Sequence, residues 1–192
     1  SRAFYSASLQ IVPLSHQVGP LPEPKGKQTP LEHFVSTSRL GFLHVQREHN
    51  DSNLKVNLQE AMMVAELINA LQKIYEQRKE PLNLSTNIGV IVPFRAQISV
   101  IKKILRRRFL HGERISVDTV ECYQGSQRDI IIYSTTISRR YQLGLLSVMQ
   151  EVDGVAVDRK LNVAITRARK QLFILGDRSI LSTNGLYRDL IE

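Results

Sequence analysis

The sequence of 192 residues contains a single cysteine, Cys122, and no tryptophan. One cysteine cannot form an internal disulfide framework or a cysteine-built zinc site. No apolar run approaches the roughly 20 residues that a bilayer-spanning helix needs, and the first residues lack the apolar segment of a secretory signal. We therefore expect an intracellular protein, cytoplasmic or associated with a nucleoid or nucleus, that makes no contact with a membrane.

Positive charge is in excess. The chain has 26 Lys and Arg against 18 Asp and Glu, a formal net charge of +8. Such an excess attracts polyphosphates, whether nucleic acid, nucleotides or an anionic membrane surface, and the charge alone does not choose among them. The 42% share of hydrophobic residues is enough for one full core and one globular domain.

Prolines gather in the first forty residues, where apolar periodicity is weak. Proline fixes φ and removes a backbone donor, so residues 20–30 are expected to form a surface loop. Leu9–Val12 is compatible with a short strand that leads into it. We assign residues 1–40 to an N-terminal extension with a Pro-rich loop and residues 41–192 to the globular domain.

Beyond residue 41, short apolar runs alternate with helical periodicity. A continuous run such as Ile88–Val92 is typical of a strand covered on both faces. The alternation predicts an α/β fold with right-handed crossovers, in which helices flank both faces of a parallel sheet. The expected strands are 42–45, 88–92, 115–117, 130–134 and 172–175; the expected helices begin at Leu58, follow Pro93 and span 161–168.

The helix that begins at Leu58 has apolar residues at the spacing of a single helix face. This face is expected to pack on the sheet. Its members are Leu58, Ala61, Met62, Ala65, Ile68, Leu71 and Tyr75.

Three polar segments adjoin the expected strands: Pro93–Gln97, Asp118–Asp129 and Asp158–Arg169. The second contains Gln-Gly-Ser-Gln-Arg-Asp, and the third contains Leu-Asn-Val-Ala-Ile-Thr-Arg-Ala-Arg. Ligands of open α/β sheets bind at the carboxyl ends of the strands. We therefore expect all three segments to lie at that edge.

In order and spacing, these segments resemble motifs IV, V and VI of superfamily 1 helicases, in the branch that includes nonsense-mediated-decay helicases and replication nuclease–helicases. The resemblance covers roughly Leu40–Asp177. It implies the second, C-terminal RecA-like domain of an ATP-dependent translocase on single-stranded DNA or RNA. It also implies that the fold is of the P-loop NTPase type, and that ATP and Mg²⁺ lie between two RecA-like domains, held mostly by the N-terminal one.

The resemblance implies that Arg167 is a catalytic arginine finger that reaches the γ-phosphate. A guanidinium stabilises the charge that spreads over the phosphoryl oxygens and does not lose its own charge. Gln124, Gly125, Gln127 and Arg159 are implied to bind the nucleotide, and many relatives carry a ribose-binding glutamate in place of Gln127. The plain alternative is that Arg167 belongs to a solvated helix end and Gly125 to an ordinary turn.

Thr119 and Gln97 are implied to hold the nucleic-acid backbone, since a hydroxyl and an amide suit contacts that ignore base sequence. Phe94 is a candidate for stacking on a base, and inward packing fits it equally well. The basic cluster between Lys102 and Arg108 also suits nucleic acid, although such a run is more often simply solvated.

The sequence has no G-x-x-x-x-G-K-[ST] loop to cradle phosphates. We therefore expect that this chain does not hydrolyse ATP alone and that the missing domain precedes Ser1, which agrees with a first residue other than methionine. Relatives often carry an arginine in an Asn-Arg-x-Glu-Ala string, and here Leu58 stands in its place. Either Arg167 acts alone from this domain, or another basic residue such as Arg95 supplies the second contact to the γ-phosphate.

Two other classes of function remain open at this stage. One is a metal-dependent nuclease that uses Asp118, Glu121 and Asp129; apart from it, no metal site is expected. The other is a catalytically degenerate RecA-like module that binds nucleic acid or a protein.

Overall fold

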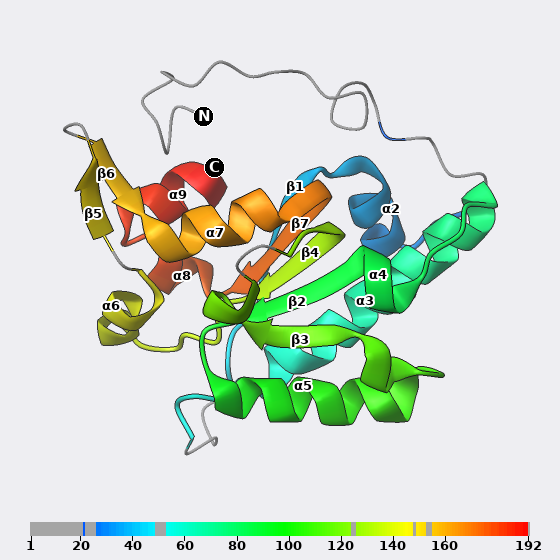
Figure 1. Cartoon of the computed structure of the whole chain (residues 1–192), viewed down its shortest axis with the longest axis horizontal. Helices are drawn as coiled ribbons and strands as arrows, with labels where there is room; N and C mark the ends of the chain where they lie inside the picture. The colour runs from blue at the N-terminus through cyan, green and yellow to red at the C-terminus, as the bar shows by residue number, and fades with distance from the viewer. Residues whose placement is uncertain are drawn as a thin grey trace.

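The computed structural model describes residues 21, 26–48, 53–123, 126–147, 149–152 and 155–191. Five strands form one sheet in the order β1-β7-β4-β2-β3 (Figure 1), and every neighbouring pair is parallel. Their bounds are β1 Leu40–His44, β2 Ile88–Val92, β3 Ser116–Thr119, β4 Arg128–Ser134 and β7 Ala168–Gly176. The strands β5 Met149–Val152 and β6 Val155–Asp158 pair antiparallel outside this sheet.

Helices cover both faces of the sheet, as predicted. The face covered by α3 and α5 has the larger buried cluster, and the other face is covered mainly by α7, α8 and α9 (Figure 1). The first group of helices is α2 Pro30–Thr37, α3 Leu58–Arg78, α4 Leu84–Asn87, α5 Arg95–Arg108 and η1 Gly112–Arg114. The second is η2 Glu121–Tyr123, η3 Arg140–Gln142, α6 Leu143–Leu146, α7 Arg159–Arg167, α8 Arg178–Leu181 and α9 Gly185–Ile191.

Both faces of the central strands are apolar. Successive side chains of a strand point to opposite sides, so a continuous apolar run supplies apolar side chains to both faces. On β4, Ile130 and Ile132 enter the cluster beneath α3 and α5, whereas Ile131 and Tyr133 enter the cluster beneath α7. All four are fully buried. The continuous apolar runs read in the sequence are therefore strands sandwiched between helix layers.

Short polar side chains fix where several helices begin. The side chain of Asn57 accepts from the backbone N–H of Glu60 at the start of α3, and Asp158 caps α7 by accepting from Lys160 and Leu161. Such caps satisfy backbone donors that have no partner within the helix. Both helices are thereby anchored at their N-terminal ends.

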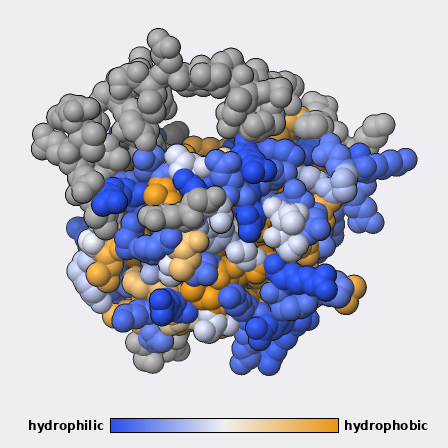
Figure 2. All heavy atoms as spheres, in the orientation of Figure 1, coloured by the Kyte–Doolittle hydropathy of each residue, from blue (hydrophilic) through white to orange (hydrophobic). Residues whose placement is uncertain are grey.

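The outer side of α5 is basic, with Arg106, Arg107 and Arg108 exposed to solvent. Figure 2 shows hydrophilic side chains along the lower margin of the molecule, where Figure 1 places α5. The inner side of the same helix buries Ile101 and Leu105.

The structure corrects the sequence analysis in two places. Helix α2 was not predicted; it packs against α3 and buries Val35, so the packed domain reaches back at least to Pro30. Its start carries a readable signal, a capping box between Thr29 and Glu32. On α3 the predicted stripe is wrong at its first turn, because Leu58 and Met62 are 46% and 47% exposed. Leu9–Val12 and most of residues 20–25 lie outside the described residues.

Of the helices that the structure describes, none combines the length and the apolar character that crossing a bilayer requires.

Candidate functional site

The strands of the main sheet begin at one edge, here called the amino edge, and end at the opposite carboxyl edge. At the amino edge, Arg128 of β4 is in register with Ala168 of β7. Beside this pair, Nε of Arg169 donates a hydrogen bond to Oε1 of Gln127 at 3.3 Å. The second and third polar segments, far apart in sequence, thus meet at the amino edge.

Arg167 is the last residue of α7 and lies at the same amino edge. Its side chain is half-buried, and one terminal nitrogen donates to Oγ1 of Thr166 at 3.3 Å. Its Nε is buried and has no hydrogen-bond partner among the described residues. An unsatisfied buried donor costs about 1–3 kcal/mol. The terminal nitrogens of Arg167 carry further N–H groups beyond the one that Thr166 accepts, and these are the donors that an anionic ligand could use.

Arg159 lies at the opposite end of α7, where it is exposed. A nine-residue helix is about 13 Å long. The structure therefore brings Gln127 and Arg167 to one edge and leaves Arg159 at the other. Gln124 and Gly125 lie outside the described residues.

The carboxyl edge holds the other candidates. Thr119 ends β3, is in register with Val92 at the end of β2, and is partly exposed. Phe94 follows β2 as the residue that precedes α5, and it too is partly exposed. Thr119 and Phe94 thus follow neighbouring strands at one edge.

The candidates therefore occupy two edges, and the expectation that all three polar segments lie at the carboxyl edge is wrong. The reason is topological. The link from β3 to β4 is a parallel crossover: it leaves the carboxyl edge at Thr119 and ends at the amino edge at Gln127. A polar segment that precedes a parallel strand lies at the amino edge.

Gln97 is fully buried, and both ends of its amide are used inside the protein. Its Oε1 accepts from the backbone N–H of Asn57 at 2.9 Å, and its Nε2 donates to the backbone oxygen of Asn57 at 2.9 Å. A contact between Gln97 and nucleic acid would require these bonds to be exchanged. In this structure Gln97 holds the start of α3 against α5.

Glu60 is the centre of the same buried network. Its carboxylate accepts from Oγ of Ser134 at 2.6 Å and from the backbone N–H of Thr136 at 2.9 Å on one oxygen, and from Nδ2 of Asn57 at 3.1 Å on the other. Burial raises the pKa of Glu60 to about 8, against the opposing effect of these hydrogen bonds. The network joins α3 to the end of β4 at the carboxyl edge.

Asp118, Glu121 and Asp129 do not form a shared metal site. Asp118 is in register with Ile91 near the carboxyl edge, whereas Asp129 lies at the amino edge. There the carboxylate of Asp129 accepts from Nζ of Lys170 at 2.9 Å and from Nδ2 of Asn87 at 3.0 Å. The hydrogen bond with Asp129 raises the pKa of Lys170. In the part of the chain that the structure describes, no three His, Cys, Asp or Glu side chains are grouped to hold a metal ion. The geometry thus contradicts the nuclease interpretation.

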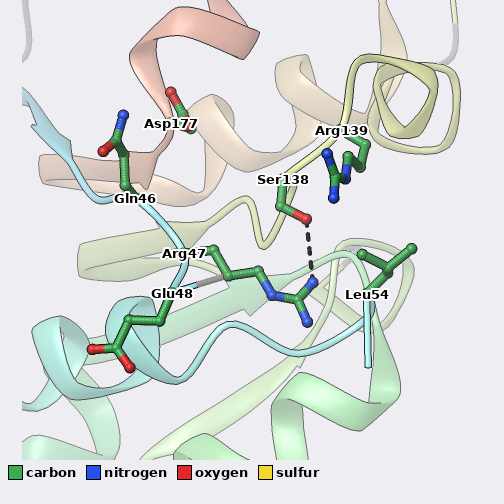
Figure 3. Close-up of a pocket in the computed structure, with 7 residues that line it drawn as sticks. All are labelled: Gln46, Arg47, Glu48, Leu54, Ser138, Arg139 and Asp177. Atoms are coloured by element: carbon green, nitrogen blue, oxygen red, sulfur yellow. Dashed lines mark hydrogen bonds between the residues drawn. The ribbon is translucent and has the colours of Figure 1, made fainter. Parts of the chain in front are cut away.

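A cavity at the carboxyl edge includes residues that the sequence analysis missed. Arg47, which follows β1, and Ser138 and Arg139, which follow β4, line it (Figure 3). The available signal was the position of Ser138–Arg140 after a buried strand, the rule already applied to the three polar segments. Arg47 follows β1 in the same way.

Comparison with known proteins agrees with the motifs. A family model described as AAA domain matches residues 1–179. The protein named probable helicase senataxin from Mus musculus is 33% identical over 147 residues, which is 76% of this chain and 5% of that protein. Helicase SEN1 from Saccharomyces cerevisiae is 27% identical over 152 residues, 77% of this chain and 6% of that protein. An uncharacterized ATP-dependent helicase from Methanocaldococcus jannaschii is 28% identical over 148 residues, 77% of this chain and 19% of that protein.

The parallel sheet with helices on both faces places the chain in the class of RecA-like domains of the P-loop NTPase type. Within that class, the chain belongs to the AAA domain family of superfamily 1 helicases. It spans between 5% and 19% of the length of the relatives named above.

Proposed function

We propose that this chain is the second motor domain of an ATP-driven helicase or translocase and that it supplies Arg167 as an arginine finger. The observation that carries the proposal is the half-buried guanidinium of Arg167, which ends α7 and has no carboxylate partner among the described residues. It lies at the amino edge, where Arg169 and Gln127 join two of the helicase motifs. The helicase names of the relatives support the same activity.

Mg²⁺–ATP, when bound, supplies the phosphoryl group that is transferred to water. The guanidinium of Arg167 would hold the negative charge that develops on the phosphoryl oxygens, with a planar fork that cannot be deprotonated. Gln127 would orient the nucleotide by hydrogen bonds to the ribose hydroxyls. Gln124 and Gly125 are assigned to the same nucleotide by motif position alone.

The partner at this edge would be the N-terminal RecA-like domain, which would hold most of the ATP and the Mg²⁺. Because the sequence has no phosphate-cradling loop, the 192-residue chain alone should show no ATP turnover.

The carboxyl edge would carry single-stranded DNA or RNA. Phe94 and Thr119 are partly exposed there and offer an aromatic ring and a hydroxyl. Arg159 begins α7 on the same side and is exposed. Phosphates of the strand are therefore an alternative ligand for Arg159, in place of the nucleotide.

The test is ATP hydrolysis by the full-length protein, with and without single-stranded DNA or RNA. Turnover should rise with the strand and fall at least ~100-fold in the Arg167→Ala variant, while nucleotide binding survives, since fingers contribute about 10³–10⁵ in rate. Arg167→Lys should recover little, because lysine keeps the charge and lacks the fork. Arg114→Ala, which removes an exposed arginine from η1, is the matched control.

Full activity in the Arg167→Ala variant would exclude the arginine-finger role. Absence of turnover in the unmodified protein, with strand binding retained, would instead favour a catalytically degenerate binding module.

A further inference from the structure

The outer face of α5 carries a group of cations, here called the basic strip. The helix contains no Asp or Glu. Three members of the strip are exposed to solvent and Lys102 is partly exposed. In Figure 2 this part of the surface, along the lower margin where Figure 1 places α5, is hydrophilic. The strip consists of Lys102, Lys103, Arg106 and Arg107.

The protein does not neutralise the basic strip itself. On the neighbouring elements, Glu66 of α3 pairs with Arg108, and Oε1 of Glu113 in η1 lies 3.9 Å from Nε of Arg114. In the part of the chain that the structure describes, no carboxylate pairs with any member of the strip. The four cations are therefore open to an external anionic partner.

Helix stability explains only part of this charge. Cations in the last turn interact favourably with the C-terminal end of the helix dipole, which accounts for Arg106 and Arg107. Lys102 and Lys103 lie before the last turn, where that effect has faded. Each of them also has an arginine four positions further on, and like charges at this spacing destabilise a helix. Anionic groups laid on this face would relieve the repulsion.

An apolar side chain follows the strip at the end of α5. Leu110 is 85% exposed, the highest value among the large hydrophobic residues that the structure describes. The residues around it are held in place: Phe109 packs against the core, and the backbone N–H of Gly112 donates to the backbone oxygen of Phe109 at 3.0 Å. The surface thus joins a row of cations to one outward leucine.

The spacing of the strip matches that of an extended peptide. Lys103 and Arg107 are four residues apart, about 6 Å along the helix axis. Alternate residues of an extended chain point to the same side and are about 6.6–6.8 Å apart. A peptide with an acidic residue at every second position would therefore present one carboxylate to each of these cations and continue toward Leu110.

Leu110 also distinguishes between two classes of anionic partner. Nucleic acid is bound through its phosphates and, when single-stranded, through stacking on aromatic rings. The strip and Leu110 offer no aromatic ring, and an exposed leucine adds nothing to a phosphate contact. A protein segment that combines carboxylates with an apolar side chain would use both features of the surface. The observations therefore favour a protein partner.

We infer that the basic strip and Leu110 form a docking surface for an acidic, extended protein segment that carries an apolar residue. The carboxylates of the segment pair with the strip, and its apolar residue covers Leu110. The inference does not rest on the proposed function, because the proposed motor uses neither the strip nor Leu110. The helix α5 and the helix α7, which ends in Arg167, cover opposite faces of the sheet (Figure 1).

The test is fluorescence anisotropy of the full-length protein with a fluorescein-labelled, amidated peptide of alternating Glu and Ser that ends in Leu. At low salt, Arg107→Glu should weaken binding about 3- to 10-fold, because an ion pair is lost and a repulsion replaces it. Leu110→Ser should weaken binding about threefold or more, and should have no effect on a peptide in which Ser replaces the Leu. Arg188→Glu makes the same charge change at an exposed arginine of α9, on the other face, and should leave the affinity unchanged.

The same variants are then titrated with single-stranded and duplex DNA. Arg107→Glu should weaken DNA binding no more than Arg188→Glu does. A selective loss of DNA binding in Arg107→Glu, with Leu110→Ser binding the peptide normally, would assign the strip to nucleic acid and overturn the inference. Equal losses of peptide affinity in Arg107→Glu and Arg188→Glu would also overturn it, because they would reflect net charge alone. So would failure of the unmodified protein to bind the peptide at low salt.

Discussion

Arg169 and Gln127 are 42 positions apart in sequence, and the Nε of Arg169 donates to the Oε1 of Gln127 across a distance of 3.3 Å. This hydrogen bond connects the segment before β4 with the second residue of β7. Both residues are exposed, so the bond itself contributes little stability. The bond instead holds the side chain of Gln127 in place at the amino edge, where Arg167 also lies.

The first prediction concerns Gln127. The Gln127→Ala variant of the full-length protein should raise the KM for ATP about 2- to 10-fold and change kcat less, as expected for one neutral hydrogen bond to the nucleotide. Gln127→Glu should lower KM or leave it unchanged, because a carboxylate accepts from both ribose hydroxyls. Steady-state ATPase kinetics measure both. An unaltered KM in the alanine variant would show that Gln127 does not contact ATP.

A second prediction separates the two roles considered for Gln97. The Gln97→Ala variant leaves the buried backbone N–H of Asn57 without its partner, while the backbone oxygen of Asn57 loses one of two bonds and keeps the one from the N–H of Ala61. We expect the free energy of unfolding in urea to fall by about 1–3 kcal/mol. The exposed Gln127→Ala change should cost less than ~0.5 kcal/mol. Undiminished stability together with weaker strand binding would instead support direct contact with nucleic acid.

The third prediction is a dependence of stability on pH. Burial raises the pKa of Glu60 to about 8, above the ordinary carboxyl value of 4.5. The folded state therefore binds this proton more tightly than the unfolded state. The resulting stabilisation is complete below about pH 4.5 and is lost as the pH rises toward 8.

Unfolding of the chain in urea at a series of pH values measures this effect. Relative to the Glu60→Gln variant, the unmodified chain should lose stability between about pH 5 and pH 8. Glu76→Gln changes an exposed glutamate of the same helix and should leave the pH profile as it is. Parallel profiles for the unmodified chain and Glu60→Gln would contradict the prediction.

The fourth prediction concerns two glycines. A Cβ at Gly112 would collide with the backbone oxygen of Leu105 in α5, which cannot turn away as a side chain does. Gly112→Ala should therefore lower the free energy of unfolding by about 1–3 kcal/mol. Among the described residues, no atom outside the neighbouring residues and backbone of α6 lies within 4 Å of a carbon added at Gly144, so Gly144→Ala should be neutral or stabilising by about 0.4–1 kcal/mol. Thermal unfolding of the two variants tests the contrast.

Much of the fold was predictable from sequence, because buried parallel strands leave a continuous apolar run. Ile88–Val92 was predicted at its observed bounds, and α3 at its observed start. The short helices α2, α8 and α9 were missed, since helices of this length are stabilised by packing more than by periodicity. Leu58 and Met62 were assigned to the buried stripe because an apolar pattern does not show where a helix leaves the sheet.

The site was less predictable than the fold. The motif strings identified Arg167 and Gln127, but the edge on which they lie depends on the crossover between β3 and β4. The burial of Gln97 depends on the start of α3 meeting α5, a contact between residues 40 positions apart. Arg47 and Ser138 are 91 positions apart, so no local pattern could connect them.

Helix α7 reaches from one edge of the sheet to the other. Near its first turn, Lys160 is paired with Glu121 at 3.4 Å, just beyond the end of β3, and its last residue is Arg167. A helix of two and a half turns is too short to bend appreciably. As a short, stiff helix it would carry a displacement of its first turn, on the side proposed for the nucleic-acid strand, to Arg167 at its other end. The two ligands of the proposed motor would thus share one rigid mechanical part.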